Sequence, residues 1–208
     1  MKIRWMNVIP DEVRTKLIMI EPELLISGYA AGYFPMSDEK GEISWYSPDP
    51  RAVIPMESVN IPRSTKQLLK KDIFSVRINT QFEEVIRGCA NRSETWISEE
   101  IIQSYMELYH LGYAFSFEAY DSNSLAGGLY GVALGGAFFG ESMFSRKTGA
   151  SKVALAVLIT TLKQRGYALL DVQFLTPHLQ MFGAIEISRT KYLEILEKAI
   201  NKKVLPIL

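Results

Sequence analysis

Two acidic side chains and one amide are the residues of this chain whose types and spacing best fit chemistry. Glu141 follows the apolar run 134–139, while Asp171 and Gln173 follow the run 167–170. Both runs predict buried strands, so we expect the three polar side chains to converge at one edge of a sheet. Converging carboxylates can bind a basic group and assist a proton transfer. The alternative is that each acid only caps the loop that follows it.

The elements that would position these residues give a mixed α+β fold, in which helices flank antiparallel strands before a strand, a helix and a further strand. Residues 36–62 are rich in turns and prolines, which favours a small N-terminal domain over residues 1–62 and a larger domain over 63–208. A capping box at Thr80 to Glu83 is expected to open one helix. Hydrophobic periodicity predicts helices over residues 23–33, 64–71, 80–90, 98–112, 150–165 and 188–200. It predicts strands over residues 74–78, 113–120, 125–134, 137–140 and 167–173.

The composition fits a globular protein of the cytoplasm. Hydrophobic residues make up 48% of the chain and charged residues 22%, with a formal net charge of zero. Any contact with nucleic acid must therefore depend on local clusters of cations. The single cysteine, Cys89, excludes an internal disulfide and favours a reducing compartment, and one Cys with two separated His predicts no metal site. No signal peptide and no apolar run long enough to cross a membrane is found.

A group of cations lies on the short helix expected after residue 62. Arg63, Lys66 and Lys70 share one face of that helix, and Lys71 follows at its end. Such a stripe suits the phosphates of a nucleic acid. The alternative is an ordinary solvated helix face.

Short stretches spread along the chain carry a resemblance to a known family. They are Gly32-Tyr-Phe-Pro35, Trp45-Tyr-Ser-Pro-Asp-Pro-Arg51, Ile61-Pro-Arg-Ser64, Gly88-Cys-Ala90, Thr95-Trp-Ile97, Gly127-Gly-Leu-Tyr-Gly131, Gly140-Glu-Ser-Met-Phe-Ser-Arg146 and Gly183-Ala-Ile-Glu-Ile187. In this order and spacing they resemble the leucyl/phenylalanyl-tRNA-protein transferases over about residues 22 to 195. Three positions depart from residues that are common in that family, namely Met36, Gln67 and Met181.

The resemblance implies both a fold and a reaction. The implied fold is a small N-terminal domain on a larger domain similar to the acyl-CoA N-acyltransferases (GNAT-like). The implied reaction moves Leu, Phe or Met from aminoacyl-tRNA to the N-terminal Arg or Lys of acceptor proteins, which marks those proteins for degradation. Because the ester is already activated, we expect no cofactor and no metal. We also expect a monomer.

For this reaction we expect three side chains to be catalytic. Gln173 would accept a hydrogen bond from the attacking amine, and Asp171 would orient that arrangement. Glu141 would position the amine or the basic side chain of the acceptor. Since Asp171 and Gln173 are expected at a strand end, their replacement by Ala is expected to leave the fold intact. His178, in the loop after Gln173, could also approach this site.

The tRNA would be held by the cationic helix and by two further residues. The resemblance assigns tRNA binding to the helix that carries Arg63, Lys66, Lys70 and Lys71. Trp96 could stack on a terminal adenine, or it could lie at the rim of the core. Arg146 leads into the N-terminus of the helix expected at residue 150, where free N–H groups and the helix dipole favour a phosphate. Its alternative role is that of a solvated residue beside a helix cap.

An apolar pocket for the transferred amino acid is expected around the Glu141 segment. Its candidate members are Leu129, Phe138, Met143 and Phe144, which could instead be ordinary sheet core.

Two other functions remain open on the sequence. The loop after Arg146 also resembles the pyrophosphate loop of CoA-dependent GNAT N-acetyltransferases, although that function gives the cationic helix no role. A non-catalytic adaptor for basic N-termini or RNA would not need Asp171 and Gln173 beside a pocket.

Overall fold

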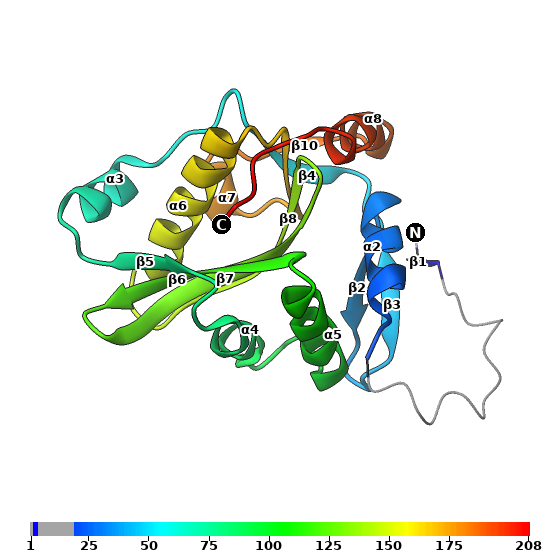
Figure 1. Ribbon diagram of the computed structural model, residues 1–208, viewed down its shortest axis with the longest axis horizontal. Coiled ribbons are helices and arrows are strands. Elements are labelled where there is room, and N and C mark those ends of the chain that lie inside the picture. Colours follow the sequence, from blue (N-terminus) through cyan, green and yellow to red (C-terminus); the bar gives the residue numbers. More distant parts are fainter. Residues whose placement is uncertain (1, 4–18) are drawn as a thin grey trace.

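The computed structural model in Figure 1 describes residues 2–3 and 19–208, and it confirms the expected α+β class. A large twisted sheet lies between two layers of helices, with α3 and α6 on one face and α4 and α5 on the other. The helices are α2 (Pro22–Ala30), α3 (Arg63–Lys70), α4 (Phe82–Ala90), α5 (Glu99–His110), α6 (Ala150–Arg165), α7 (Pro177–Gln180) and α8 (Arg189–Ile200). The strands are β1 (Lys2–Ile3), β2 (Phe34–Ser37), β3 (Ile43–Tyr46), β4 (Arg51–Pro55), β5 (Ser75–Ile78), β6 (Ala114–Asp121), β7 (Ser124–Leu134), β8 (Ala137–Ser145), β9 (Leu169–Gln173) and β10 (Ile185–Ile187).

The large sheet has seven strands in the order β10-β4-β9-β8-β7-β6-β5, and a small sheet has the order β1-β3-β2. The expected antiparallel run of strands is confirmed in β6, β7 and β8. The next strand, β9, is reached through α6 and lies parallel to β8. One apolar core lies between the sheet and α2, α4, α5 and α8, and a second lies between the sheet and α6.

The segment 36–62 was expected to be rich in turns, and it also contributes strands to both sheets. Pro35 is tolerated because β2 is an edge strand that pairs only with β3, and Pro55 is the last residue of β4. β4 pairs with β9 and so belongs to the large sheet although it precedes residue 62. Residues 1 and 4–18 of the expected N-terminal domain lie outside the described residues, and the division at residue 62 stays a prediction.

Several helix boundaries follow the local chemistry of the sequence. Ser98 and Ser188 cap α5 and α8 by accepting a backbone N–H three residues further on. Gly166 ends α6 in the left-handed conformation, with φ of 84°. None of the described helices is both long enough and apolar enough to cross a membrane.

The expected capping box at the start of α4 is wrong. The helix begins after Gln81, whose side chain makes no capping hydrogen bond. Instead the buried carboxylate of Glu118, on β6, accepts hydrogen bonds from the Thr80 hydroxyl and from the N–H groups of Thr80 and Gln81. A carboxylate from a distant strand therefore accepts the hydrogen bonds of the N–H groups directly before this helix. No local pattern could indicate such a contact.

Candidate active site

Two irregular residues bend the neighbouring strands β8 and β9 beside the polar side chains. On β8, Gly140 and Ser142 face consecutive residues of β7, so Glu141 between them is an extra residue. On β9, Asp171 and Gln173 face consecutive residues of β4 in the same way, so Val172 is extra. Such bulges re-aim side chains and are common next to active sites.

A cavity of about 470 Å³ is lined by the ends of β8 and β9 that lie beyond their last paired residues. The two strands pair in parallel only as far as Phe139 and Asp171. The apolar part of the cavity lies against α6 and α7, and its lining includes Leu129, Met143, Leu155, Leu158, Leu170 and Leu179. The polar part includes Arg92, Trp96, Tyr130, Glu141 and Gln173.

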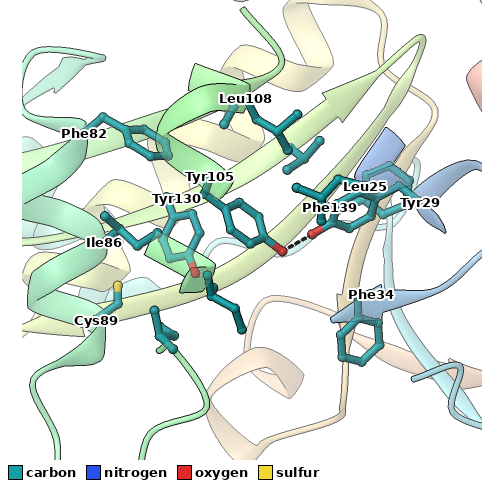
Figure 2. Packing of buried hydrophobic residues seen from close by; sticks show 14 of the residues in the cluster. Leu25, Tyr29, Phe34, Phe82, Ile86, Cys89, Tyr105, Leu108, Tyr130 and Phe139 are labelled. Carbon is teal, nitrogen blue, oxygen red and sulfur yellow. Dashed lines mark hydrogen bonds between the residues drawn. The ribbon is translucent and has the colours of Figure 1, made fainter. Parts of the chain in front are cut away.

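Glu141 is buried in the polar part of this cavity, with 9% of its surface exposed. One carboxylate oxygen accepts a hydrogen bond from Tyr105 Oη at 3.1 Å, and the other accepts one from Gln173 Nε2 at 3.1 Å. The Tyr105 hydroxyl is also hydrogen-bonded to that of Tyr29 (Figure 2). Burial raises the pKa of Glu141 to about 7, although hydrogen bonds from the two tyrosines partly offset the effect.

Asp171 is fully buried in an ion pair, which corrects the expectation that no core contact depends on it. Its two oxygens accept hydrogen bonds from Arg51 Nε at 2.9 Å and Arg51 Nη2 at 2.6 Å. Tyr192 Oη and the backbone N–H of Gln173 donate to the same carboxylate at 2.8 and 3.0 Å. The Arg51 guanidinium lies 4.8 Å from the ring centroid of Phe34 and 4.6 Å from that of Tyr192. Asp171 is thus held on every side by protein groups.

Gln173 has the left-handed backbone conformation, with φ of 58°. This conformation is costly for a residue other than glycine and concentrates at functional sites. The hydrogen bond from its N–H to Asp171 stabilises the turn, while its side-chain amide reaches Glu141. No described residue donates a hydrogen bond to the Gln173 side-chain oxygen, which therefore stays available at the cavity.

The structure divides the four candidate pocket residues into two pairs. Leu129 and Met143 line the cavity, as expected of pocket residues. Phe138 is fully buried in the core beside α6, and Phe144 lies on the other side of β8 against Gly88. Neither belongs to the cavity lining.

The cavity also contains residues that the sequence did not single out. Leu155 and Leu158 project from α6, a helix so rich in buried apolar residues that periodicity cannot tell which of them face a cavity. Two residues that were named from the sequence, the half-buried Trp96 and His178, line it as well. The pKa of His178 is lowered by burial and by the charge of Lys152. Among residues 2–3 and 19–208, no group of three or more His, Cys, Asp or Glu side chains could hold a metal ion.

The expected tRNA-binding cations lie outside the cavity. Arg63, Lys66, Lys70 and Lys71 are exposed on or just after α3, and none of them forms an ion pair with another described residue. Arg146 is also exposed, but it pairs with Glu84 at 2.9 Å and lies over the ring of Phe144.

Two comparisons of the sequence with known proteins agree on one family. Residues 53–197 match the sequence model of the leucyl/phenylalanyl-tRNA protein transferases, and residues 19–49 match the model of their N-terminal domain. A leucyl/phenylalanyl-tRNA–protein transferase of Rubrobacter xylanophilus is 50% identical over 88% of this chain and 96% of that protein. One from Chlorobium limicola is 51% identical over 89% of this chain and 98% of that protein. The solved structure of L-PGS from Bacillus licheniformis has a TM-score of 0.41 and 12% identity, covering 74% of this chain and 50% of that one. The chain therefore belongs to the leucyl/phenylalanyl-tRNA protein transferase family.

Proposed function

We propose that this aminoacyltransferase moves Leu, Phe or Met from the 3′ ester of aminoacyl-tRNA to the α-amine of proteins that begin with Arg or Lys. The product would be marked for degradation by its new N-terminus. The observation that carries this proposal is the hydrogen-bonded pair of Glu141 and Gln173 in a cavity whose other part is apolar. The apolar part suits the transferred side chain, and the acid suits a basic acceptor.

The proposed mechanism relies on positioning, because the ester is already activated. An N-terminal amine has a pKa of about 8, so a useful fraction is neutral near pH 7 and only modest base assistance is needed. The free side-chain oxygen of Gln173 accepts a hydrogen bond from this amine. Asp171 holds the Gln173 turn, and Glu141, with a pKa of about 7, attracts the basic acceptor residue and can take a proton.

The competing CoA-dependent acetyltransferase receives less support from the loop that leads to α6. Arg146 pairs with Glu84, and Lys147 pairs with Asp121, so both cations already have partners. The side chain of Leu68 also lies close to Gly149, directly before α6. A pyrophosphate would have to displace these contacts.

The direct test incubates the protein with radiolabelled Leu-tRNA and a reporter protein that begins with Arg. We expect label to enter the reporter without ATP or added metal. The matched control is the same reporter beginning with Asp, which should take up little label because Glu141 repels a second acid. Equal labelling of both reporters would contradict the assigned acceptor, and labelling of neither would contradict the proposed activity.

Salt should weaken transfer if the cations of α3 bind tRNA phosphates, because each neutralised phosphate releases counterions. Replacing Lys70 and Lys71 together by Ala should raise the KM for aminoacyl-tRNA. It should also reduce the slope of log(kcat/KM) against log[salt] by about 1 to 2, one for each lost contact. The matched control replaces Lys202 and Lys203, two lysines near the C-terminus. A salt slope that is identical in both variants and the wild type would exclude α3 from the tRNA site.

The cavity should discriminate between isomeric side chains. A slot that accepts branching at Cγ crowds the second Cβ substituent of Ile, and a misplaced methyl group typically costs about 1 to 3 kcal/mol. We therefore expect kcat/KM for Leu-tRNA to exceed that for Ile-tRNA by about 10- to 100-fold when both carry the same tRNA body. Equal values would show that Leu129 and Met143 do not contact the transferred side chain.

A further inference from the structure

One residue that lines the polar part of the cavity has a hydroxyl without a hydrogen-bond partner among the described residues. Tyr130 is fully buried, lines the cavity, and is one of the few residues in the described part of the chain with a buried side-chain oxygen or nitrogen that lacks a hydrogen bond. Leaving such a group unpaired costs stability, so a protein that keeps one beside a cavity is prepared for a ligand atom.

The ring of Tyr130 is held firmly by its neighbours. It makes edge-on contacts with Phe82 and Tyr105, with ring centroids at 5.9 and 5.5 Å. On the sheet, Tyr130 faces Ser142, the residue directly after the extra residue Glu141. Figure 2 shows Tyr130 and Tyr105 side by side, on β7 and α5. The Tyr130 hydroxyl therefore occupies a fixed position near the proposed reaction site.

The two donors that hydrogen-bond to Glu141 are already engaged. The Tyr105 hydroxyl bonds to Glu141 and Tyr29, and the Gln173 amide donates to Glu141. An incoming amine finds acceptors in Glu141 and in the free oxygen of Gln173. What the engaged groups do not supply is a donor for the ester carbonyl, the atom that gains negative charge during aminolysis.

We propose that the Tyr130 hydroxyl donates a hydrogen bond to the carbonyl oxygen of the aminoacyl ester and to the oxyanion that this oxygen becomes. This inference rests on the proposed function. The amine nitrogen bonds to the carbonyl carbon, and the C=O π pair moves onto oxygen. When the intermediate collapses, the C=O bond reforms, the bond to the ribose oxygen breaks, and that oxygen receives the proton that the amine gives up.

Tyr130 keeps its own proton throughout these steps. Burial raises the pKa of Tyr130 well above its ordinary value, and the negative charge of Glu141 adds to the effect. The hydroxyl is thus a neutral donor over the whole pH range in which the amine can react. A donor held in place before the reaction stabilises the charged intermediate more than the neutral ester.

The test is the Tyr130→Phe variant in single-turnover transfer from Leu-tRNA to an Arg-initiated reporter. We expect kcat to fall by about 100-fold, the lower end of the loss on removing one oxyanion donor. The KM for aminoacyl-tRNA should stay within about twofold, because the contact strengthens only in the transition state. The melting temperature should not fall, since the deleted oxygen has no hydrogen-bond partner in the described part of the chain.

Tyr109→Phe is the matched control from the same aromatic cluster. Tyr109 stacks on Phe82, with ring centroids at 4.7 Å, and its hydroxyl donates to the backbone oxygen of Asn79. Deleting that hydroxyl should leave kcat unchanged and lower the melting temperature slightly. Binding of a non-reactive, amide-linked Leu-tRNA should be equal in both variants and the wild type.

The outcomes separate this inference from the function on which it rests. A wild-type protein that transfers nothing refutes the proposed function. An active wild type with an equally active Tyr130→Phe variant refutes only the role of Tyr130. A raised KM with unchanged kcat also overturns that role, because it would show a contact that is equally strong in the bound substrate and in the transition state.

Discussion

The Asp171→Ala variant should lose about 3 to 5 kcal/mol of unfolding free energy, because it leaves the guanidinium of Arg51 buried without a counter-ion. Both side chains are almost completely buried, so solvent cannot replace the lost carboxylate. Transfer should also fall by about 100-fold at temperatures where the variant is folded, since Gln173 loses the acceptor that fixes its turn. Urea unfolding and single-turnover transfer on the same sample measure the two effects.

The double variant Arg51→Met with Asp171→Leu separates stability from positioning. Replacing a whole buried ion pair with apolar residues of similar size is often neutral or stabilising. We therefore expect the double variant to recover most of the lost stability but none of the lost transfer. If Asp171→Ala unfolds at the same urea concentration as the wild type, the ion pair does not stabilise this region. If the double variant recovers transfer, Asp171 does not position Gln173.

Replacing Glu141 by Gln should make the protein more stable at pH 8 and a poorer enzyme. Burial raises the pKa of Glu141 from 4.5 to about 7, so the folded state binds a proton more tightly than the unfolded state does. A raised carboxyl pKa means that stability is highest below about pH 4.5 and is lost as the pH rises towards 7. The full loss above pH 7 is about 3 kcal/mol. The KM for an Arg-initiated acceptor should rise by about 10- to 100-fold, since a charged hydrogen bond is lost.

Stability curves of the wild type and Glu141→Gln against pH provide the measurement. The two should be close at pH 4.5, where the carboxyl of the wild type is protonated when folded. They should then separate by about 3 kcal/mol in favour of the variant by pH 8. A constant difference between pH 4.5 and 8 would mean that Glu141 does not titrate with a raised pKa.

Local sequence patterns predicted the elements that depend on near neighbours. Hydrophobic periodicity located the helices α5, α6 and α8 and the strands β6 and β7. The polar residues after the two apolar runs also came together, since Gln173 donates a hydrogen bond to Glu141. The helices and strands could be predicted because each depends on a few consecutive residues.

The local sequence patterns missed the features that depend on contacts between distant residues. Arg51 and Asp171 are 120 residues apart, and no local pattern indicates that the arginine is buried against the acid. Glu141 was expected to follow its strand but is an extra residue within it, a feature that depends on the partner strand β7. The cavity lining on α6 follows from where β8 and β9 separate, so Leu155 and Leu158 could not be distinguished from their buried neighbours.

The pairing of β4 with β9 also determines when the protein can become active during its own synthesis. Ribosomes add about 5 to 20 residues per second, so β4 emerges roughly ten seconds before its partner. During that interval the buried residues Ala52, Val53 and Ile54 have neither β9 nor β10 beside them. Unpaired apolar strands of this kind are sites of aggregation, and chaperones protect them. A nascent chain that ends before β9 therefore carries all of α2 to α6 and still lacks an assembled site.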